Sequence, residues 1–209
     1  MNSAIQQDDP STHGGLKRQQ SLLFPSLLTK LDRSERLCVL DIGPAHNETI
    51  QFFSAYKCRL HFAGLYSESL TRNGSEGRDR EDMAREFKRL LSVPSATRFD
   101  LILFWDYTNY LDDEALCAFS DALTPYLHAR TLGHGFAVRS SSTRIDNRWY
   151  GIESEHMFTV RPPRDRQPIF TPHAQAILIN LLTCFTIDRG MLLPDGRLEV
   201  SMKAQLDSD

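Results

Sequence analysis

The chain has 209 residues, of which 41% are hydrophobic and 24% are charged, with a formal net charge of −3 at pH 7. This length and composition are typical of one α/β domain with a substantial core, and the charge gives no strong signal for nucleic acid or anionic lipid as a partner. No run of about 18 apolar residues predicts a membrane-spanning helix, and no signal-peptide core is present in the first twenty residues, so we expect a cytoplasmic protein.

The chain begins with a segment that lacks apolar periodicity, residues 1–20, which we predict to be a disordered tail. Leucines at helical spacing then predict a short helix over residues 21–31. An apolar run of β-prone residues, 36–42, indicates a strand buried on both faces. A tight turn and a helix follow this strand. Strand, turn and helix in this order open a doubly wound sheet, in which ligands lie beyond the carboxyl ends of the strands.

The helix after this strand begins near Asn47, whose side chain can cap a helix N-terminus. Its inward face is predicted to consist of Ile50, Phe53 and Ala55. The turn between strand and helix, residues 41–46, is therefore the first place to look for a site.

Strands and helices continue to alternate along the middle of the chain. A second strand over residues 58–65 precedes a polar loop, 67–77, and a charged helix, 79–91, on which basic and acidic residues alternate. Because the signs cancel, we interpret the outer side of this helix as a solvated face. A second buried strand, 99–105, runs into a polar turn.

Asp112 or Asp113 can cap the next helix, whose inner face is predicted to carry Leu116, Phe119, Leu123 and Leu127. Pro125 is expected to kink its last turns. A strand over residues 132–139 follows.

Residues 140–168 form the least regular part of the sequence, and a loop of this length is usually functional or disordered. Its arginines could hold an anionic substrate, although interspersed acidic residues favour a solvated loop. Pro172 suits the first turn of a further helix. Two strands, 184–193 and 197–203, then close the chain as an antiparallel hairpin.

The four cysteines lie far apart, each in an apolar context, and are interpreted as buried thiols. Neither a Cys-x-x-Cys pair nor a histidine–cysteine spacing predicts a metal site. The motifs of serine hydrolases and of phosphate-binding loops are also missing, and the three-glycine fingerprint of dinucleotide-binding proteins is absent.

Residues 36–203 resemble the class I S-adenosylmethionine-dependent methyltransferases. Residues 38–43, Cys-Val-Leu-Asp-Ile-Gly, resemble the first motif of that family, residues 99–103 resemble its fourth-strand motif, and residues 132–135 resemble the approach to its fifth strand. The resemblance implies a Rossmann-like α/β fold with a mostly parallel, doubly wound sheet and an antiparallel C-terminal hairpin. The domain would span residues 21–203, with a short tail at 204–209, and the family's third strand would be shortened or missing.

The resemblance also implies S-adenosylmethionine as cofactor. In the family, an acidic residue and glycines let the backbone approach the methionine part of the cofactor, and a second acid accepts hydrogen bonds from the ribose. Here the first carboxylate after the second strand is Glu68. The implied cofactor-binding residues are Asp41, Gly43, Pro44, Ala45, Gly64, Leu65, Tyr66, Trp105 and Asp106.

Polar groups at the end of the strand 99–105 are the second candidate site, because a few convergent polar groups are expected of a ligand pocket. Asp106 is the candidate catalytic base for a nitrogen or oxygen acceptor. Asn109, Tyr110 and Arg144 are candidate substrate contacts. In a purely structural alternative, the side chains of Asp106 and Asn109 form hydrogen bonds with the local backbone. For Asp41, the structural alternative is that its carboxylate binds the N–H groups of its own turn.

The predicted function is therefore methyl transfer from S-adenosylmethionine to an unidentified acceptor. The alternative is a catalytically inactive methyltransferase-fold protein with a binding or regulatory role, since fold does not settle function. The sequence leaves a partner protein open.

Overall fold

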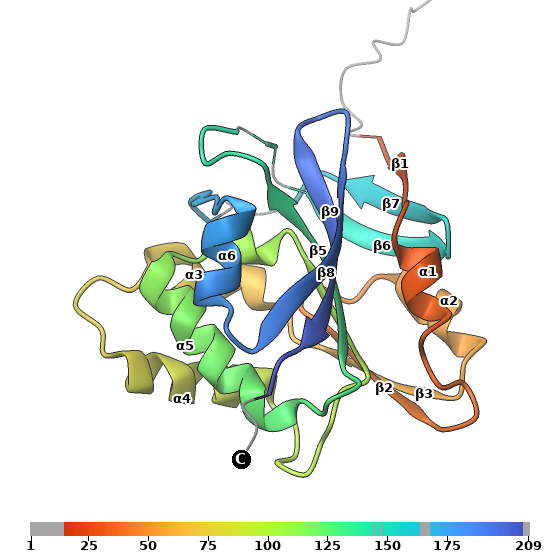
Figure 1. The fold of residues 1–209 in the computed structure, drawn as a ribbon, viewed down its shortest axis with the longest axis horizontal. Coiled ribbons are helices and arrows are strands. Elements are labelled where there is room, and N and C mark those ends of the chain that lie inside the picture. The colour runs from red at the N-terminus through yellow and green to blue at the C-terminus, as the bar shows by residue number, and fades with distance from the viewer. Residues whose placement is uncertain (1–14, 144, 147, 164–167, 207–209) are drawn as a thin grey trace, which may run out of the picture.

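The computed structural model describes residues 15–143, 145–146, 148–163 and 168–206. A six-stranded sheet in the order β3-β2-β4-β5-β9-β8 forms its centre (Figure 1). Its strands are β2 (Leu37–Asp41), β3 (Cys58–Phe62), β4 (Leu101–Trp105), β5 (Leu132–Val138), β8 (Phe185–Leu192) and β9 (Arg197–Ala204). Strands β3, β2, β4 and β5 pair in parallel, whereas β9 is antiparallel to both of its neighbours. The predicted fold class is confirmed.

Helices cover both faces of this sheet (Figure 1). One face carries α1 (Phe24–Leu28) and α2 (Asn47–Ser54), and the other carries α3 (Ser69–Asn73), α4 (Arg80–Leu91), α5 (Asp113–Leu123) and α6 (Gln175–Leu181). The described residues also form three short 3-10 helices: η1 (Leu65–Ser67), η2 (Tyr107–Tyr110) and η3 (Thr124–Tyr126). Between β3 and β4 the chain forms only helices and turns, so the third strand of the family is missing here, as predicted.

A second, three-stranded sheet has the order β1-β7-β6, with β1 (Lys17–Gln20), β6 (Trp149–Ser154) and β7 (Met157–Arg161). The prediction that residues 140–168 are irregular is therefore wrong for residues 149–161, which form the β6–β7 hairpin. Tyr150 and Ile152 of β6 belong to the core, whereas Glu153 between Ile152 and Ser154 is exposed.

Residues 17–20, assigned to the tail by their sequence, form β1 and pair with β7. The side chains of this strand are polar, so its sequence has no apolar pattern by which it could be recognised. The strand is held instead by backbone hydrogen bonds to β7.

Helix α2 departs from the prediction at its start. Asn47 is its first residue, and His46 occupies the cap position without a side-chain cap bond. Ile50 is 46% exposed, so its assignment to the inner face is wrong, as is that of the exposed Ala55. Thr49 is buried instead, where its hydroxyl accepts a hydrogen bond from the Ile152 N–H of β6 at 3.2 Å.

Three other helix predictions can be compared with the structure. Asp112 caps α5 as predicted, with its carboxylate accepting the Ala115 N–H at 2.9 Å. Helix α6 begins at Gln175, so Pro172 precedes the helix rather than lying in its first turn. The loop predicted over residues 67–77 contains the short helix α3.

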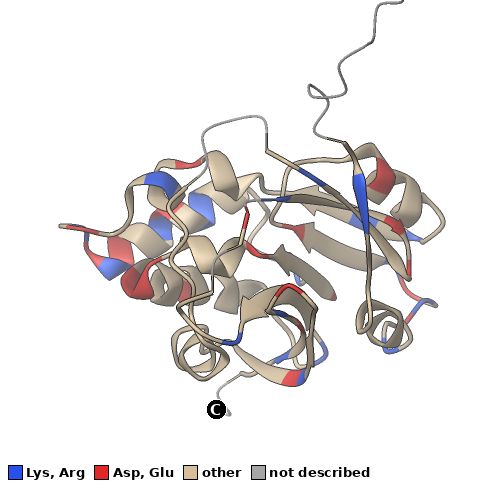
Figure 2. Ribbon diagram, turned by 90° about the horizontal axis from the view of Figure 1, so that it is seen from above, with Lys and Arg blue, Asp and Glu red and all other residues tan. Residues whose placement is uncertain are grey.

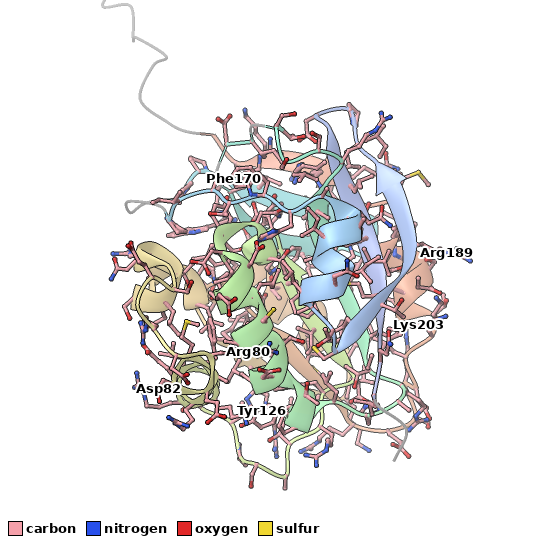
Figure 3. All side chains as sticks on the ribbon, turned by 60° about the vertical axis from the view of Figure 1, so that its left-hand side comes forward. Arg80, Asp82, Tyr126, Phe170, Arg189 and Lys203 are labelled. Atoms are coloured by element: carbon pink, nitrogen blue, oxygen red, sulfur yellow. The ribbon has the colours of Figure 1, made fainter. Side chains whose placement is uncertain are left out.

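Charges of both signs lie side by side over the helices at the left of Figure 2. On α4, Arg85 pairs with Asp82, and Glu86 pairs with Arg78, which precedes the helix. Figure 3 shows Arg80 beside α5, where its guanidinium binds the Asp121 carboxylate at 2.7 and 2.8 Å. Because these charges neutralise one another, this face carries no net signal for a charged partner.

No helix among the described residues is long and apolar enough to cross a membrane. The same residues contain no group of three or more histidine, cysteine or acidic side chains that could hold a metal ion. All four cysteines are free thiols; Cys184 is buried, and the other three are half-buried.

Candidate functional site

The turns after β2 and β3 are joined to each other by their backbones. The Gly64 N–H donates to the Gly43 carbonyl at 3.2 Å, and the Leu65 N–H donates to the Ile42 carbonyl at 3.1 Å. Strand β4 pairs with the other side of β2 and delivers Trp105 to the same edge of the sheet. The fold thus brings these predicted cofactor residues together at the carboxyl ends of the strands.

Asp41 lies at the end of β2 and is 1% exposed. Its Oδ1 atom accepts hydrogen bonds from the Gly43 N–H at 2.8 Å and from the Trp105 indole N–H at 2.7 Å. Its Oδ2 atom is buried without a hydrogen-bond partner among the described residues. Burial raises the pKa of Asp41 to about 7, although the two hydrogen bonds act in the opposite direction.

A stability measurement against pH can test this environment of Asp41. Between pH 4 and pH 7 the folded chain retains a proton that the unfolded chain has lost, so stability falls as pH rises through this window. Asp41→Asn cannot ionise and should escape the loss. We expect the variant to be more stable than the wild type by about 2 to 4 kcal/mol at pH 8 and similar to it at pH 4. Urea unfolding at both pH values measures this, and parallel pH profiles would contradict it.

Trp105 ends β4 in an unusual backbone conformation, with φ at +51°. The register between β4 and β5 shifts between Leu103 and Trp105, so this residue lies at a bulge. Its indole lies against the first-motif turn: a Cβ atom added at Gly43 would be 3.3 Å from Trp105 Cδ1. The room that a glycine leaves at this turn is therefore taken by a side chain of the same protein.

Tyr150 of β6 stacks on the Trp105 ring. The two rings stack with centroids 5.2 Å apart and planes 4° apart, and Phe136 also stacks on Tyr150, at 5.1 Å. The Arg197 guanidinium lies 4.7 Å from the Phe136 ring centroid. The carboxyl ends of the central strands are thus packed under aromatic rings from β5 and β6.

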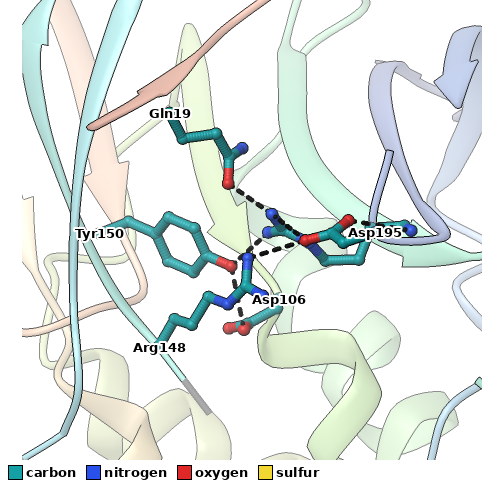
Figure 4. A network of polar contacts seen from close by, with 6 residues as sticks. Gln19, Asp106, Arg148, Tyr150 and Asp195 are labelled. Carbon is teal, nitrogen blue, oxygen red and sulfur yellow. Dashed lines mark hydrogen bonds and ion pairs between the residues drawn. The ribbon is translucent and has the colours of Figure 1, made fainter. Parts of the chain in front are cut away.

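Asp106 is 2% exposed, and Figure 4 shows the Tyr150 hydroxyl beside its carboxylate. Its Oδ1 accepts the Tyr66 hydroxyl at 2.7 Å, and its Oδ2 accepts the Tyr150 hydroxyl at 3.3 Å. Tyr150 in turn accepts a hydrogen bond from Arg197 Nη1 at 2.6 Å. Burial raises the pKa of Asp106 to about 6, against the hydrogen bond from Tyr66 and the charge of Arg197.

The network extends from Arg197 to the turn between β8 and β9. Arg197 binds the Asp195 carboxylate through Nε and Nη2 at distances of 2.9 to 3.1 Å. Arg148 binds the same carboxylate at 2.9 Å (Figure 4). The pKa of Asp195 is lowered, because the hydrogen bond and charge of Arg197 outweigh the opposing effect of burial.

Several predicted site residues have structural partners instead of an open pocket. The Asn109 side chain donates to the carbonyls of Asp106 at 3.0 Å and Phe136 at 2.8 Å, as the structural alternative expects. Leu65 belongs to the buried core, and Ala45 is exposed. Tyr110 packs on Tyr66 and Phe170, at 5.6 and 5.5 Å, while Pro44 is half-buried and Arg144 lies outside the described residues.

Tyr150, Phe136, Asp195 and Arg197 were not among the residues that the sequence selected. For Tyr150 a signal existed, because the alternation in residues 149–161 around Glu155 and His156 is that of a hairpin. Arg197 carried no signal, since a lone arginine in a predicted strand does not reveal that it will be buried.

These contacts decide what the strand-end site can do chemically. Asp106 has a pKa suited to accepting a proton near neutral pH, but both of its oxygens are bonded to tyrosines, so a substrate would first have to displace one of them. The fit to S-adenosylmethionine is poor: Trp105 fills the space beside Gly43, and no carboxylate ends β3.

No protein-family model and no curated protein matches the sequence. Solved structures do match the fold. An S-adenosylmethionine-dependent methyltransferase from Clostridium acetobutylicum is 14% identical, with 87% of this chain and 90% of that chain covered and a TM-score of 0.52. A protein from Pyrococcus horikoshii is 13% identical, with 88% of both chains covered and a TM-score of 0.51. Streptomyces venezuelae DesVI is 13% identical, with 88% and 92% covered and a TM-score of 0.50. At these identities the likeness concerns the fold alone.

Proposed function

We propose that this chain, which has the fold of the class I S-adenosylmethionine-dependent methyltransferases, is a non-catalytic protein with a binding or regulatory role. The observation that carries the proposal is the position of Trp105. Its indole hydrogen-bonds to Asp41 and lies against Gly43, the two residues that match the family's first motif. A ligand at this turn would have to remove a buried, stacked and hydrogen-bonded indole.

The surroundings of Trp105 support the same proposal. Strand β6 packs directly on α2, the helix that follows the first-motif turn, and a Cβ added at Gly151 would lie 3.5 Å from both His46 and Glu48. Arg161 of β7 pairs with Glu48. The small sheet is therefore tied to the helix beside the strand ends, so it holds Tyr150 over Trp105.

One observation favours a second candidate, methyl transfer from S-adenosylmethionine to an unidentified acceptor. Asp41 Oδ2 is buried without a partner among the described residues, and a buried, unsatisfied carboxylate oxygen at a strand end can mark a ligand site. In that function Asp106 would act as the base, and Asn109, Tyr110 and Arg144 would contact the acceptor. It requires Trp105 and Tyr150 to move away from the first-motif turn.

Thermal unfolding with S-adenosylmethionine and with S-adenosylhomocysteine separates the two functions. A ligand that binds the native state at about a hundred times its Kd adds about 2.7 kcal/mol and raises the Tm by several degrees. For the wild type we expect no shift with either compound. A reproducible rise for the wild type would overturn the proposal in favour of the methyltransferase.

Trp105→Gly is the matched variant for this experiment, because glycine accepts the positive φ of this position and removes the indole. A shift in the variant alone would identify Trp105 as the group that excludes the cofactor. If neither protein shows a shift, the loss of cofactor binding is due to the wider site, including the missing acid after β3. Both outcomes agree with a non-catalytic wild type.

A further inference from the structure

A cavity of about 650 Å³ lies between β1, β7 and the turn that joins β8 to β9. This volume is within the range of pockets that bind small organic molecules. It differs from the strand-end site, because Asp41, Trp105 and Asp106 do not line it. Arg197 connects the two sites, since it lines the cavity and also binds Tyr150.

The charged part of the lining is mainly cationic. Two carboxylates, Asp146 and Asp195, and five basic side chains line the cavity. Arg18 and Arg161 are already paired with Glu153 and Glu48, which leaves Lys17, Arg148 and Arg197 to face the two carboxylates. This small surplus of positive charge in a partly enclosed space favours an anionic ligand, because the surrounding protein screens the charges less than bulk water does.

Arg148 and Arg197 form the best-defined anion-binding pair. Both bind the carboxylate of Asp195, so this side chain already occupies the position of an anion between two guanidinium groups (Figure 4). Arg197 is 2% exposed and is held by Phe136 and Tyr150, which orients its donors without a ligand. Guanidinium groups fixed in this way suit a carboxylate, sulfonate or phosphate group.

Two further features complete the site. The Gln19 Nε2 atom is buried and has no hydrogen-bond acceptor among the described residues, so the wall contributed by β1 offers an unused donor. Leu22, Val160 and Leu193 supply apolar surface to the same cavity. A ligand that matches this lining has an apolar body and one anionic group.

We propose that this cavity binds a small organic anion, with its charged group at Arg148 and Arg197 and its apolar body against Leu22, Val160 and Leu193. Asp195 then acts as an internal competitor that the ligand displaces from Arg148. The site is independent of the cofactor question, because neither the first-motif turn nor Asp106 lines it.

The test uses two fluorescent probes with nearly the same aromatic body. The anionic probe is 1-anilinonaphthalene-8-sulfonate, and the neutral probe is N-phenyl-1-naphthylamine. In titrations of the full native chain we expect the anionic probe to bind about tenfold tighter, because only it can use the two arginines. Dodecanoate should displace it, whereas dodecanol should not. Equal affinity for the two probes would overturn the proposal.

Three variants locate the binding site. Arg148→Gln should weaken the sulfonate probe about tenfold and leave the neutral probe unchanged. Asp195→Asn should strengthen the sulfonate probe several-fold, because it removes the competing carboxylate, and should leave the neutral probe unchanged; a partly unfolded variant would instead bind both probes more tightly. Arg85→Gln on α4 is the control and should change neither affinity. If Arg148→Gln and Asp195→Asn bind the sulfonate probe as the wild type does, the anion does not sit at this pair.

The outcome is separable from that of the proposed function. A failure to bind the sulfonate probe removes the cavity site but leaves the cofactor experiment untouched. A wild type that binds S-adenosylhomocysteine would remove the proposed function and leave the cavity site standing.

Discussion

Replacing Glu199 with Gln is expected to lower the free energy of unfolding by about 3 to 5 kcal/mol at pH 7. Glu199 of β9 is fully buried, and its carboxylate accepts hydrogen bonds from the Ser21 hydroxyl at 2.5 Å, the Leu22 N–H at 2.8 Å and His134 Nε2 at 2.9 Å. The variant leaves a buried histidine without its carboxylate and the start of α1 without its anchor. Thermal unfolding should show a Tm lower by about 10 °C.

The same carboxylate predicts a pH dependence. Burial alone would raise the pKa of Glu199, but the hydrogen bond and charge of His134, with Ser21 and the Leu22 N–H, lower it to about 2. The stabilisation is therefore complete above pH 4.5 and is lost as pH falls from 4.5 toward 2. Glu199→Gln should lack this acid-sensitive component.

Two control variants make the test of Glu199 specific. Glu155→Gln lies at the exposed turn between β6 and β7 and should change stability by less than about 0.5 kcal/mol. The double variant His134→Gln with Glu199→Gln should lose less than the sum of the single losses, because neither change then leaves a buried partner without its hydrogen bond. A loss below about 1 kcal/mol for Glu199→Gln would contradict the role assigned to this pair.

Replacing Trp105 with Ala is expected to cost about 3 to 5 kcal/mol, the range for truncating a large buried aromatic side chain. The variant loses the stack on Tyr150, the edge contact with Phe158 at 5.2 Å and the hydrogen bond to Asp41. Because Tyr150 also binds Asp106, the loss should loosen the whole cover over the strand ends. Urea unfolding at pH 7 measures the change.

The comparison with Trp105→Gly tests the backbone at this position. In an ordinary strand, glycine is less stable than alanine by about 0.5 to 1 kcal/mol. At φ of +51° the order should reverse, because alanine carries a Cβ that crowds the left-handed conformation. Trp105→Gly should therefore be the more stable of the two variants by about 1 kcal/mol. If Trp105→Ala is instead the more stable variant, the positive φ is not maintained without the indole.

The order of the central elements could be predicted because it depends on local patterns. The apolar runs that form β2, β4 and the β8–β9 hairpin are bounded by glycine, proline or charged residues, and each strand lies within a few residues of its predicted limits. The small sheet was harder to predict. Its strand β1 is polar throughout and exists only because β7 offers an edge for backbone pairing.

The candidate site also has residues that could be predicted from the sequence and residues that could not. Asp41, Gly43, Trp105 and Asp106 could be selected from their positions after buried strands, since the carboxyl ends of parallel strands meet at one edge. Their partners could not be selected, because Tyr150 lies 44 residues from Asp106, and Trp105 lies 64 residues from Asp41. Such pairings arise from the packing of complete elements, so no local pattern encodes them.

By itself, the sequence determined that this protein is an α/β domain with a mostly parallel sheet, a closing hairpin and an acidic residue after each of two buried strands. Only the tertiary structure decided that the space between those strand ends is filled. The physical reason is that a pocket is the space that remains after side chains have packed. The left-handed backbone of Trp105 directs its indole toward Gly43, and Tyr150 of the distant β6–β7 hairpin stacks on that indole. The same hairpin forms one wall of the cavity beside Arg197, which is the cavity that we propose to bind a small organic anion.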